Sequence, residues 1–515
     1  MLIEMNRQAE DHEVIVLGSG LGGLIAGTLL AKKGHSVLLL KERGYDSSYQ
    51  RSGYRFTLFS TFSERRLRPS LVQKISQELG LVLNGSPRNN LESKRDSGRL
   101  EEKVPFQVIL PQARVDLFDE FSLFQMEWKR EFPDEFLQIE AFYDELRLLQ
   151  SLLKAKQKTE GSPFFPIESR PIFRKWLSFF SFLRGGSGLG LASFSKEFKK
   201  FLQLQLISWG SLFPDAFPMS LAAYLLLHEE RGEWVSRLDL ESLEGGIGDS
   251  FFQSKGEIGE IDKVESVEKE WNKGFTLTLE EDRRMFHTKF LILNSPLHSF
   301  SDLLGTERKP ISRWLTKIRP RYLLFPWFLG VREKVVPVGM RDFLVSILDL
   351  EKTYGGGNVL FLALSPRGDE TASPEGRRGL IVQSLIPFER WEQTSLVSHQ
   401  ESVTKHLKHV IPFLENHLDF SDFEWAVRQV GRWSYPCFLY ETTGPFDWRA
   451  GVIPTRLSND LYFIGKENFP YLGLEGEVLS GLLVANQILK KCERGKRGGA
   501  SGGEYQKNGK VETPS

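Results

Sequence analysis

Three glycines near the beginning of the chain have the spacing of a phosphate-binding turn. Gly18, Gly20 and Gly23 form the pattern G-x-G-x-x-G. In this pattern the first glycine permits a tight bend, the second lets a pyrophosphate approach the backbone, and the third lets the next helix pack closely on the sheet. The N–H groups and the positive dipole end of that helix then face the phosphates. The spacing therefore predicts a site for a dinucleotide.

The glycines have this meaning only between two strands, and the sequence predicts both. The apolar residues 14–17 indicate a buried parallel strand, a helical pattern follows and closes at Gly34, and residues 37–40 indicate a second buried strand. A glycine-rich turn that binds no ligand is the plainer alternative. The full strand–turn–helix–strand context favours the dinucleotide site.

The composition of the 515 residues excludes several classes of function. Lys plus Arg and Asp plus Glu balance at 67 each, so nothing indicates nucleic acid as a partner. There are only two cysteines, Cys437 and Cys492, so we expect no disulfide framework, no metal site and a reducing, cytoplasmic location. The first residues are too polar for a signal peptide, so we expect none, and without an apolar run of about twenty residues we expect no helix that spans a membrane. The 39 Phe residues fit a large core or a cavity for an apolar ligand.

Dinucleotide-type elements recur at the start, the middle and the end of the chain. In the middle, Gly245 and Gly246 open a predicted short helix, and a meander of strands then returns to a buried parallel strand over 290–294. Near the end, residues 461–490 form another strand, loop and helix. We therefore predict a discontinuous nucleotide-binding domain of residues 1–115, 240–310 and 440–491, a partner domain of residues 116–239 and 311–439, and a disordered tail over 492–515.

Four stretches together resemble the flavin family that contains amine oxidases, phytoene desaturases and carotenoid isomerases. They are GSGLGGLIAG from Gly18, GYRF from Gly53, EGGIG with the strands after it, and LYFIGKENFPYLGLEGEVLSGLLVA from Leu461. A stretch from Ser365, SPRGDETASPEGRRGLIV, is similar to one typical of the phytoene desaturase branch. The resemblance implies an α/β fold with α+β inserts, in which a discontinuous Rossmann-like FAD-binding domain of the glutathione-reductase type is interleaved with a substrate domain.

The same resemblance implies non-covalently bound FAD and the positions that contact it. In the family a valine after the EGGIG stretch packs on the adenine, here Val264 or Val267. A helix that begins near Glu475 would direct its positive end at the pyrimidine edge of the flavin, although acids at a helix start also stabilise any first turn. The predicted cofactor-binding residues are Gly18, Ser19, Gly20, Gly22, Gly23, Lys41, Glu42, Arg51, Val264, Gly465, Lys466, Glu467, Gly473, Leu474 and Glu475.

Several of these positions depart from the family pattern. An acid usually ends the second strand and hydrogen-bonds the ribose, but Lys41 stands there and Glu42 follows it. The two glycines and the arginine expected next are absent, which leaves Arg51 as the candidate. The last strand is followed by Lys466 where an acid is expected, with Glu467 next. Either the site is rearranged, or flavin binding has been weakened or lost.

Residues 171–186, PIFRKWLSFFSFLRGG, combine an almost continuous apolar helix surface with basic residues toward both ends. Such a segment can lie in a membrane interface and admit an apolar substrate, which would place the protein peripherally on the inner face of a membrane. A buried helix with snorkelling basic side chains is the alternative. His228 ends an apolar helical run and fits a structural role better than that of a catalytic base. No catalytic residue is predicted, because flavin chemistry needs little from protein side chains.

Two functions from different classes fit these observations. The first is an FAD-dependent oxidoreductase similar to phytoene desaturases, which removes hydride from a long apolar isoprenoid or carotenoid-like molecule or, as a close second, isomerises one of its double bonds. The other is a lipid- or prenyl-binding protein that has lost the flavin, a relationship that Rab GDP-dissociation inhibitors have to flavoproteins. The intact glycines favour the first, whereas Lys41 and Lys466 favour the second. An amine oxidase comes third, because no aromatic cage for an amine is evident. The sequence predicts neither the electron acceptor nor the oligomeric state.

Overall fold

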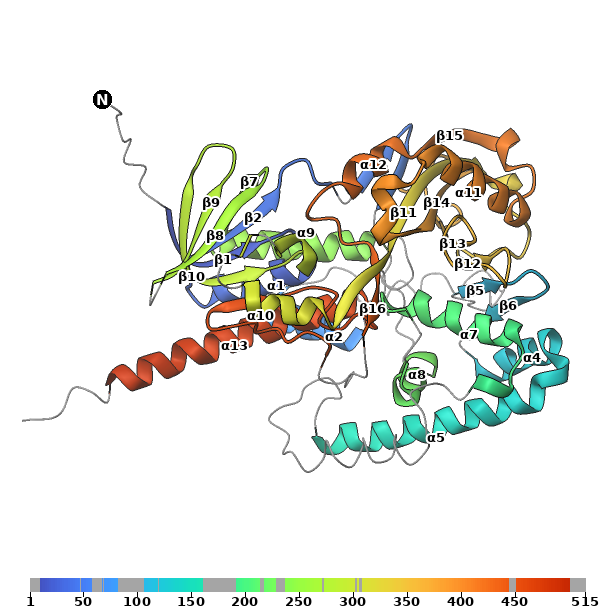
Figure 1. Ribbon diagram of the computed structural model, residues 1–515, viewed down its shortest axis with the longest axis horizontal. Coiled ribbons are helices and arrows are strands. Elements are labelled where there is room, and N and C mark those ends of the chain that lie inside the picture. The colour runs from blue at the N-terminus through green and yellow to red at the C-terminus, as the bar shows by residue number, and fades with distance from the viewer. Residues whose placement is uncertain are drawn as a thin grey trace, which may run out of the picture.

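In the computed structural model the chain forms two large sheets with helices packed around them (Figure 1). The described residues are 10–46, 48–57, 67, 69–81, 106–118, 120–160, 191–213, 217–227, 237–270, 273–301, 303–304, 308–443 and 451–500.

The first sheet has seven strands in the order β7–β2–β1–β10–β9–β8, and β17 pairs with the second half of β10. The strands are β1 (Glu10–Leu17), β2 (Val37–Glu42), β7 (Glu257–Ile261), β8 (Val264–Glu270), β9 (Gly274–Leu279), β10 (Met285–Leu293) and β17 (Leu461–Phe463). β1 pairs in parallel with both β2 and β10, so the carboxyl ends of three neighbouring strands meet at one edge. In an open parallel sheet this edge is where ligands bind.

Both faces of this sheet are covered, which explains why its central strands read as continuous apolar runs. Val14 and Val16 share an apolar cluster with α1 (Leu21–Lys32), α9 (Arg237–Gln253) and α13 (Leu474–Ala500). Ile15 and Leu17 point the other way, into the main core. α1 packs directly against α13, and Figure 1 shows the two helices close together beneath the sheet.

The second sheet has eight strands in the order β15–β11–β14–β13–β12–β5–β6, and β16 pairs with β11. They are β5 (Phe106–Ile109), β6 (Arg114–Leu117), β11 (Ile318–Arg332), β12 (Phe343–Ile347), β13 (Val359–Leu364), β14 (Arg377–Pro387), β15 (Leu418–Asp422) and β16 (Phe438–Thr442). A separate hairpin of β3 (Ser48–Arg51) and β4 (Tyr54–Thr57) packs its aromatic rings on Phe328 and Trp425.

Helices complete the second unit and join it to the first. The long α5 (Phe136–Glu160) packs against α4 (Phe121–Glu131) and α8 (Met219–Leu226), while α7 (Lys196–Trp209) touches β5 and β12. Within the described ranges the other helices are α2 (Pro69–Leu79), α10 (Arg308–Leu315), α11 (Leu396–Val410) and α12 (Glu424–Val430). The 3-10 turns there are η2 (Pro133–Glu135), η3 (Leu191–Ser193), η5 (Leu297–Phe300), η7 (Glu333–Val335), η8 (Phe388–Gln393) and η9 (Leu414–His417). Among the described residues, no helix combines the length and the apolarity needed to cross a bilayer.

Four sequence-based boundaries differ from the structure. β5 and β6 belong to the second sheet, and so does β16, so the predicted domain limits at 115 and 440 do not follow the strand pairing. Gly245 and Gly246 do not open a helix but lie inside α9, because the helix formers before them extend it back to Arg237. α13 continues to Ala500, past the predicted start of the tail at 492, because the glutamate, the lysine and the two arginines there favour propagation of a helix already begun.

Candidate nucleotide-binding site

The glycine turn lies where the sequence predicts it, between the end of β1 and the start of α1. Gly18 has a φ of +126°, a conformation that favours glycine. Its N–H donates to the carbonyl oxygen of Leu40 at 2.8 Å, and the N–H of Asn294 donates to that of Leu17 at 2.7 Å. The turn is therefore held by the ends of both neighbouring strands, and Gly20 becomes the residue that precedes α1.

Two side chains from distant parts of the chain occupy the free N–H groups at the start of α1. The N–H of Gly22 donates to Oε1 of Glu477, at 3.2 Å. The N–H of Gly23 donates to Oδ1 of Asn294, at 3.0 Å. Asn294 also donates from Nδ2 to the carbonyl oxygen of Ile464 (3.0 Å) and to Oε1 of Glu477 (3.4 Å). The chain's own carboxylate thus lies at the helix end that the sequence assigns to a phosphate.

The same glycines allow α13 and the end of β10 to approach α1 closely. A Cβ on Gly20 would lie 2.1 Å from Oε1 of Glu477, and one on Gly18 would lie 1.9 Å from the carbonyl oxygen of Asn294. Farther along, a Cβ on Gly481 would lie 2.2 Å from the carbonyl oxygen of Gly22. The two helices therefore meet backbone to backbone, and this contact brings Glu477 to the turn.

A pyrophosphate fits the backbone of this turn on one condition. The tight bend, the bare Cα of Gly20 and the N–H groups of α1 are the features that such a group requires. Ser295 adds a buried hydroxyl beside Gly18 that has no hydrogen-bond partner within the described part of the chain. The space over Gly20 holds the carboxylate of Glu477 and the amide of Asn294, which would lie 2.1 Å and 2.8 Å from a Cβ there. The residues present therefore fit a dinucleotide once the ends of these two side chains move aside.

The end of β2 does not present a free acid. Glu42 is buried, and its Oε2 accepts a hydrogen bond from the N–H of Ser434 at 2.8 Å. Burial raises its pKa above the usual range, while the contacts with Ser434 and the charge of Arg432 oppose that rise. Lys41 is half-exposed and pairs with Glu260 of β7 at 2.9 Å. In this structure both side chains are thus engaged with protein groups rather than directed at the glycine turn.

Arg51 and Val264 occupy other places. Arg51, on β3, forms an ion pair with Asp422 of β15 at 2.6 Å, which places it on the second unit. Val264 and Val267 are both buried on β8 and belong to the main core. The structure does not bring Arg51 to the glycine turn.

The loop after β17 buries a second acid. Glu467 is 3% exposed, and its Oε1 accepts a hydrogen bond from the N–H of Leu297 at 2.8 Å. Burial raises its pKa to about 7, against the lowering effect of that N–H. His298, next in the chain to Leu297, lies edge-on to the rings of Phe388 and Phe438, and burial lowers its pKa to about 4. Lys466 donates to the carbonyl oxygen of Pro436, toward the second sheet.

Protein surrounds the start of α13 on all sides. Gly473 has a φ of +56°, and the helix begins at Leu474 with Glu475 and Glu477 in its first turn. Every residue from 461 to 482 is buried. Part of the cover comes from the end of α7, where a Cβ on Gly210 would lie 2.7 Å from the backbone of Tyr471. This junction of α13, α7 and β16 is where the two units of the molecule meet.

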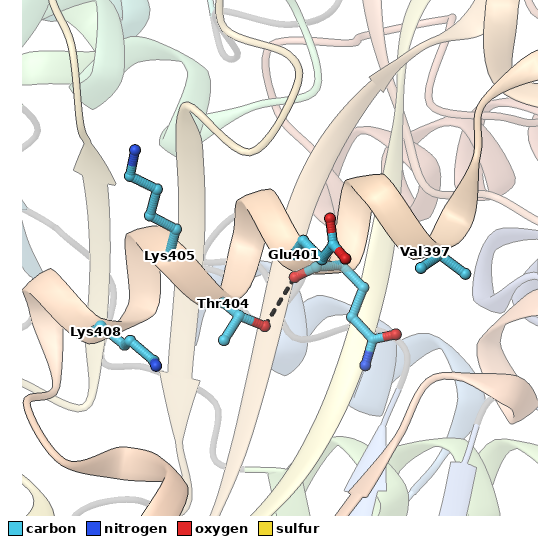
Figure 2. Close-up of a pocket in the computed structure, with 6 residues that line it drawn as sticks. Val397, Glu401, Thr404, Lys405 and Lys408 are labelled. Atoms are coloured by element: carbon cyan, nitrogen blue, oxygen red, sulfur yellow. Dashed lines mark hydrogen bonds between the residues drawn. The ribbon is translucent and has the colours of Figure 1, made fainter.

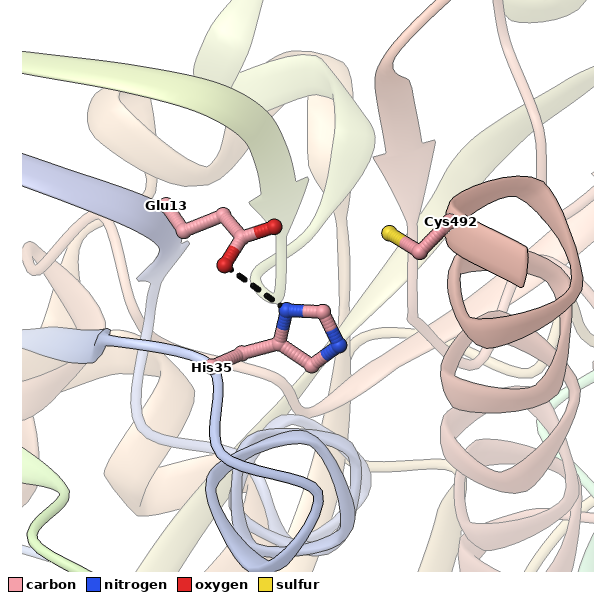
Figure 3. Close-up of side chains that lie close together, drawn as sticks. All are labelled: Glu13, His35 and Cys492. Atoms are coloured by element: carbon pink, nitrogen blue, oxygen red, sulfur yellow. Dashed lines mark ion pairs between the residues drawn. The ribbon is translucent and has the colours of Figure 1, made fainter. Parts of the chain in front are cut away.

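Two other features lie away from the turn. A pocket of about 420 Å³ on the outer face of α11 is lined by Val397, Gln400, Glu401, Thr404, Lys405 and Lys408 (Figure 2). Figure 3 shows Glu13, His35 and Cys492, whose ligand-type atoms lie within 4.8 Å of one another. Two of these three residues, Glu13 and His35, form an ion pair with each other at 2.8 Å. Sequence spacing could not predict this group, because its members are far apart in the chain.

The structure therefore brings together the predicted glycine turn, Gly465 and the start of α13. It also places at this turn residues that the sequence analysis did not predict. Asn294 and Ser295 follow the returning strand, and the rule that carboxyl ends of parallel strands meet could have identified them. Glu477 was visible only as an acid at a helix start. The predicted membrane segment 171–186 and His228 lie outside the described residues.

The sequence is similar to proteins of one branch of the flavin family. No model of a protein family matches it. It is 24% identical to prolycopene isomerase 2 of an Oncidium hybrid cultivar, over 93% of this chain and 84% of that protein. It is 23% identical to the prolycopene isomerase of Arabidopsis thaliana, over 93% and 82%. These relatives confirm the predicted resemblance to the carotenoid isomerase branch.

Solved structures confirm the predicted fold class. Putrescine oxidase bound to putrescine superposes with a TM-score of 0.59, at 14% identity, over 94% of this chain and all of that one. Cyclohexylamine oxidase from Brevibacterium oxydans gives 0.56 at 15% identity, with the same coverage. An oxidoreductase from Methanosarcina mazei gives 0.52 at 14% identity, over 91% and 99%. The chain thus shares the fold of these oxidases and of this oxidoreductase.

Proposed function

We propose that this protein is an FAD-dependent enzyme that isomerises a double bond of a long, apolar, carotenoid-like polyene. The observation that carries the proposal is the similarity to prolycopene isomerases over 93% of the chain, which spans both units of the molecule. An isomerisation moves no net electrons and needs no external acceptor. Desaturation, which removes a hydride and a proton from the substrate, is the alternative reaction on the same fold.

The chain's own residues support a site for the cofactor. The backbone N–H group of Gly22 would hold a phosphate once Glu477 has left it, and that of Gly23 would do so once it has left Asn294, with the hydroxyl of Ser295 nearby. Bound flavin supplies a centre that can give and take electrons as a pair or singly. The start of α13 would direct its positive helix end at that centre after the protein that now covers this helix start has moved aside.

The junction between the units has the surroundings that an apolar substrate needs. The rings of Phe388 and Phe438 pack around a neutral His298, and burial excludes water from this region. Glu467 lies beside them and, with a pKa of about 7, can hold or release a proton at its carboxylate near neutral pH. We further propose that the protein is cytoplasmic and binds peripherally to a membrane. The apolar substrate would then enter from that membrane through residues 171–186.

A flavin-free binding protein is the second candidate, favoured by one observation. The carboxylate of Glu477 stands at the turn where the phosphates would bind, and the surrounding segment is closed. An amine oxidase remains a third alternative, but the amine oxidases among the solved structures share only the fold with this chain.

The test begins with reconstitution. We expect purified protein incubated with FAD and then gel-filtered to retain a flavin band at about 450 nm. The retained protein, with its flavin reduced under anaerobic conditions, should convert a poly-cis carotenoid in liposomes to more trans forms, measured by chromatography. Gly20→Val is the control, because a side chain there would occupy the pyrophosphate position. Retained FAD with no change in any carotenoid would refute the substrate class, and no retained FAD would favour the binding protein, whose ligand would then be sought by lipid extraction and mass spectrometry.

The membrane part needs its own assay. We expect the protein to sediment with anionic liposomes, less so at high salt, and the double variant Trp176→Ser with Phe180→Ser to sediment less while keeping its FAD. A sharp fall in melting temperature of that variant would instead identify both residues as core.

A further inference from the structure

We propose that Glu477 is an internal competitor for the nucleotide phosphates, so that a dinucleotide binds only by displacing this carboxylate from the start of α1. The inference rests on the proposed function only for the identity of the ligand, because FAD is the dinucleotide that the proposed function requires. It assigns to Glu477 the role of setting how tightly this chain holds its cofactor.

The first observation is that two helix starts converge on one carboxylate. Glu477 lies in the first turn of α13, and its Oε1 accepts the N–H of Gly22 in the first turn of α1, 455 residues away in the chain. The backbone contact between Gly22 and Gly481 keeps the two helices in this arrangement. The N-terminus of α1 carries partial positive charge, so this place attracts an anion.

The second observation is that the carboxylate and a phosphate would use the same space and the same donor. A Cβ on Gly20 would lie 2.1 Å from Oε1 of Glu477, so the volume that the bare glycine leaves open is already filled. The N–H of Gly22 is satisfied by that oxygen. A phosphate that took this donor would displace the carboxylate or lie beside a like charge in a buried place, which is unfavourable.

The third observation is an unsatisfied group that points to a missing ligand. The Ser295 side chain is 7% exposed, and its Oγ has no hydrogen-bond partner within the described part of the chain. It lies next to Gly18, where a Cβ would be 2.8 Å from this oxygen. A buried hydroxyl without a partner is uncommon. The carboxylate of Glu477 therefore satisfies only part of the turn, and a larger anion could satisfy the rest.

The experiment measures binding of ADP and of FAD by calorimetry to the full chain and to two variants of Glu477. Glu477→Gln keeps the shape and removes the charge, whereas Glu477→Ala removes both. We expect both variants to bind ADP and FAD more tightly than wild type, by roughly 5- to 150-fold, the usual range for coupled binding equilibria. Glu477→Ala should bind at least as tightly as Glu477→Gln, because it also vacates the space.

Two controls accompany these measurements. Glu127→Gln changes a carboxylate that is as buried as that of Glu477 but lies in α4, where it accepts the N–H of Asp116, and it should leave the affinity for ADP unchanged. Without ligand, Glu477→Ala should melt at a lower temperature than wild type, because α1 loses its cap. Circular dichroism shows whether each variant is folded at the temperature of the titration.

The outcomes separate this inference from the proposed function. Tighter ADP binding by both Glu477 variants supports the competitor even if no form of the protein binds FAD, in which case only the flavin function fails. Equal or weaker binding of ADP and FAD by the folded variants overturns the competitor, even if wild-type protein binds FAD and isomerises a carotenoid. Absence of ADP and FAD binding in every form also overturns it, because Glu477 would then not be the obstacle.

Discussion

Replacing Glu467 with glutamine should stabilise the protein at neutral and alkaline pH. The carboxyl group is buried, and its pKa rises from the ordinary 4.5 to about 7. One pKa unit corresponds to about 1.4 kcal/mol, so the charged form costs about 3 kcal/mol in the folded protein. Glutamine keeps the volume and the oxygen that accepts the N–H of Leu297, but it carries no charge.

The sign of the pH dependence follows from the direction of the shift. Between about pH 4.5 and 7 the folded protein holds a proton on Glu467 that the unfolded chain has already lost. The free energy of unfolding of wild type therefore falls as the pH rises through this interval. Relative to wild type, Glu467→Gln should show no pH-linked gain below about pH 4.5 and its full advantage of about 3 kcal/mol above about pH 7.

Urea denaturation of both proteins between pH 4.5 and 8 measures this difference. The other titrating groups contribute equally to the two curves and cancel in the difference. Glu351→Gln, at a largely exposed side chain, is the control for the loss of one carboxylate elsewhere on the chain. Parallel curves for wild type and Glu467→Gln would show that this carboxyl group is not held in a desolvated place.

Three further changes test other parts of the structure by the free energy of unfolding. Gly481→Val should destabilise the protein by about 1–3 kcal/mol or more, because its Cβ would meet the backbone of Gly22 at 2.2 Å; an unchanged value would mean that α1 and α13 do not pack this closely. Glu42→Ala should lower the free energy of unfolding by about 1–3 kcal/mol, because the N–H of Ser434 loses its acceptor, and it should leave FAD affinity unaltered. Lys41→Ala removes a half-exposed ion pair and should cost less than about 1 kcal/mol. Weaker FAD binding by Glu42→Ala would instead support the ribose contact predicted from the sequence. Arg378→Ala should cost about 1–3 kcal/mol, because the buried guanidinium donates to the carbonyl oxygen of Ser365 and pairs with the half-exposed Asp342. A neutral result would count against these contacts.

The features that could be read from the sequence are those whose causes are local. The spacing of Gly18, Gly20 and Gly23 predicts the turn because a tight bend and a close approach require glycine at those places. The apolar runs at 14–17 and 290–294 predict buried parallel strands, and the structure pairs them with each other. The helix that contains Gly245 was less predictable, since neighbouring helix formers outweigh the cost of glycine inside a helix.

Contacts between distant segments determine what lies at the turn. Glu477 reaches Gly22 only because Gly481 lets α13 rest against α1, and Glu42 meets Ser434 across 392 residues. A helical pattern shows that an acid is near a helix start, but the neighbouring element decides which N–H it meets. The spacing of the glycines along the chain therefore predicts a backbone that suits a phosphate. The packing of α1 against α13 decides that a carboxylate lies there, because the direction of a side chain depends on neighbours that only the folded chain brings together.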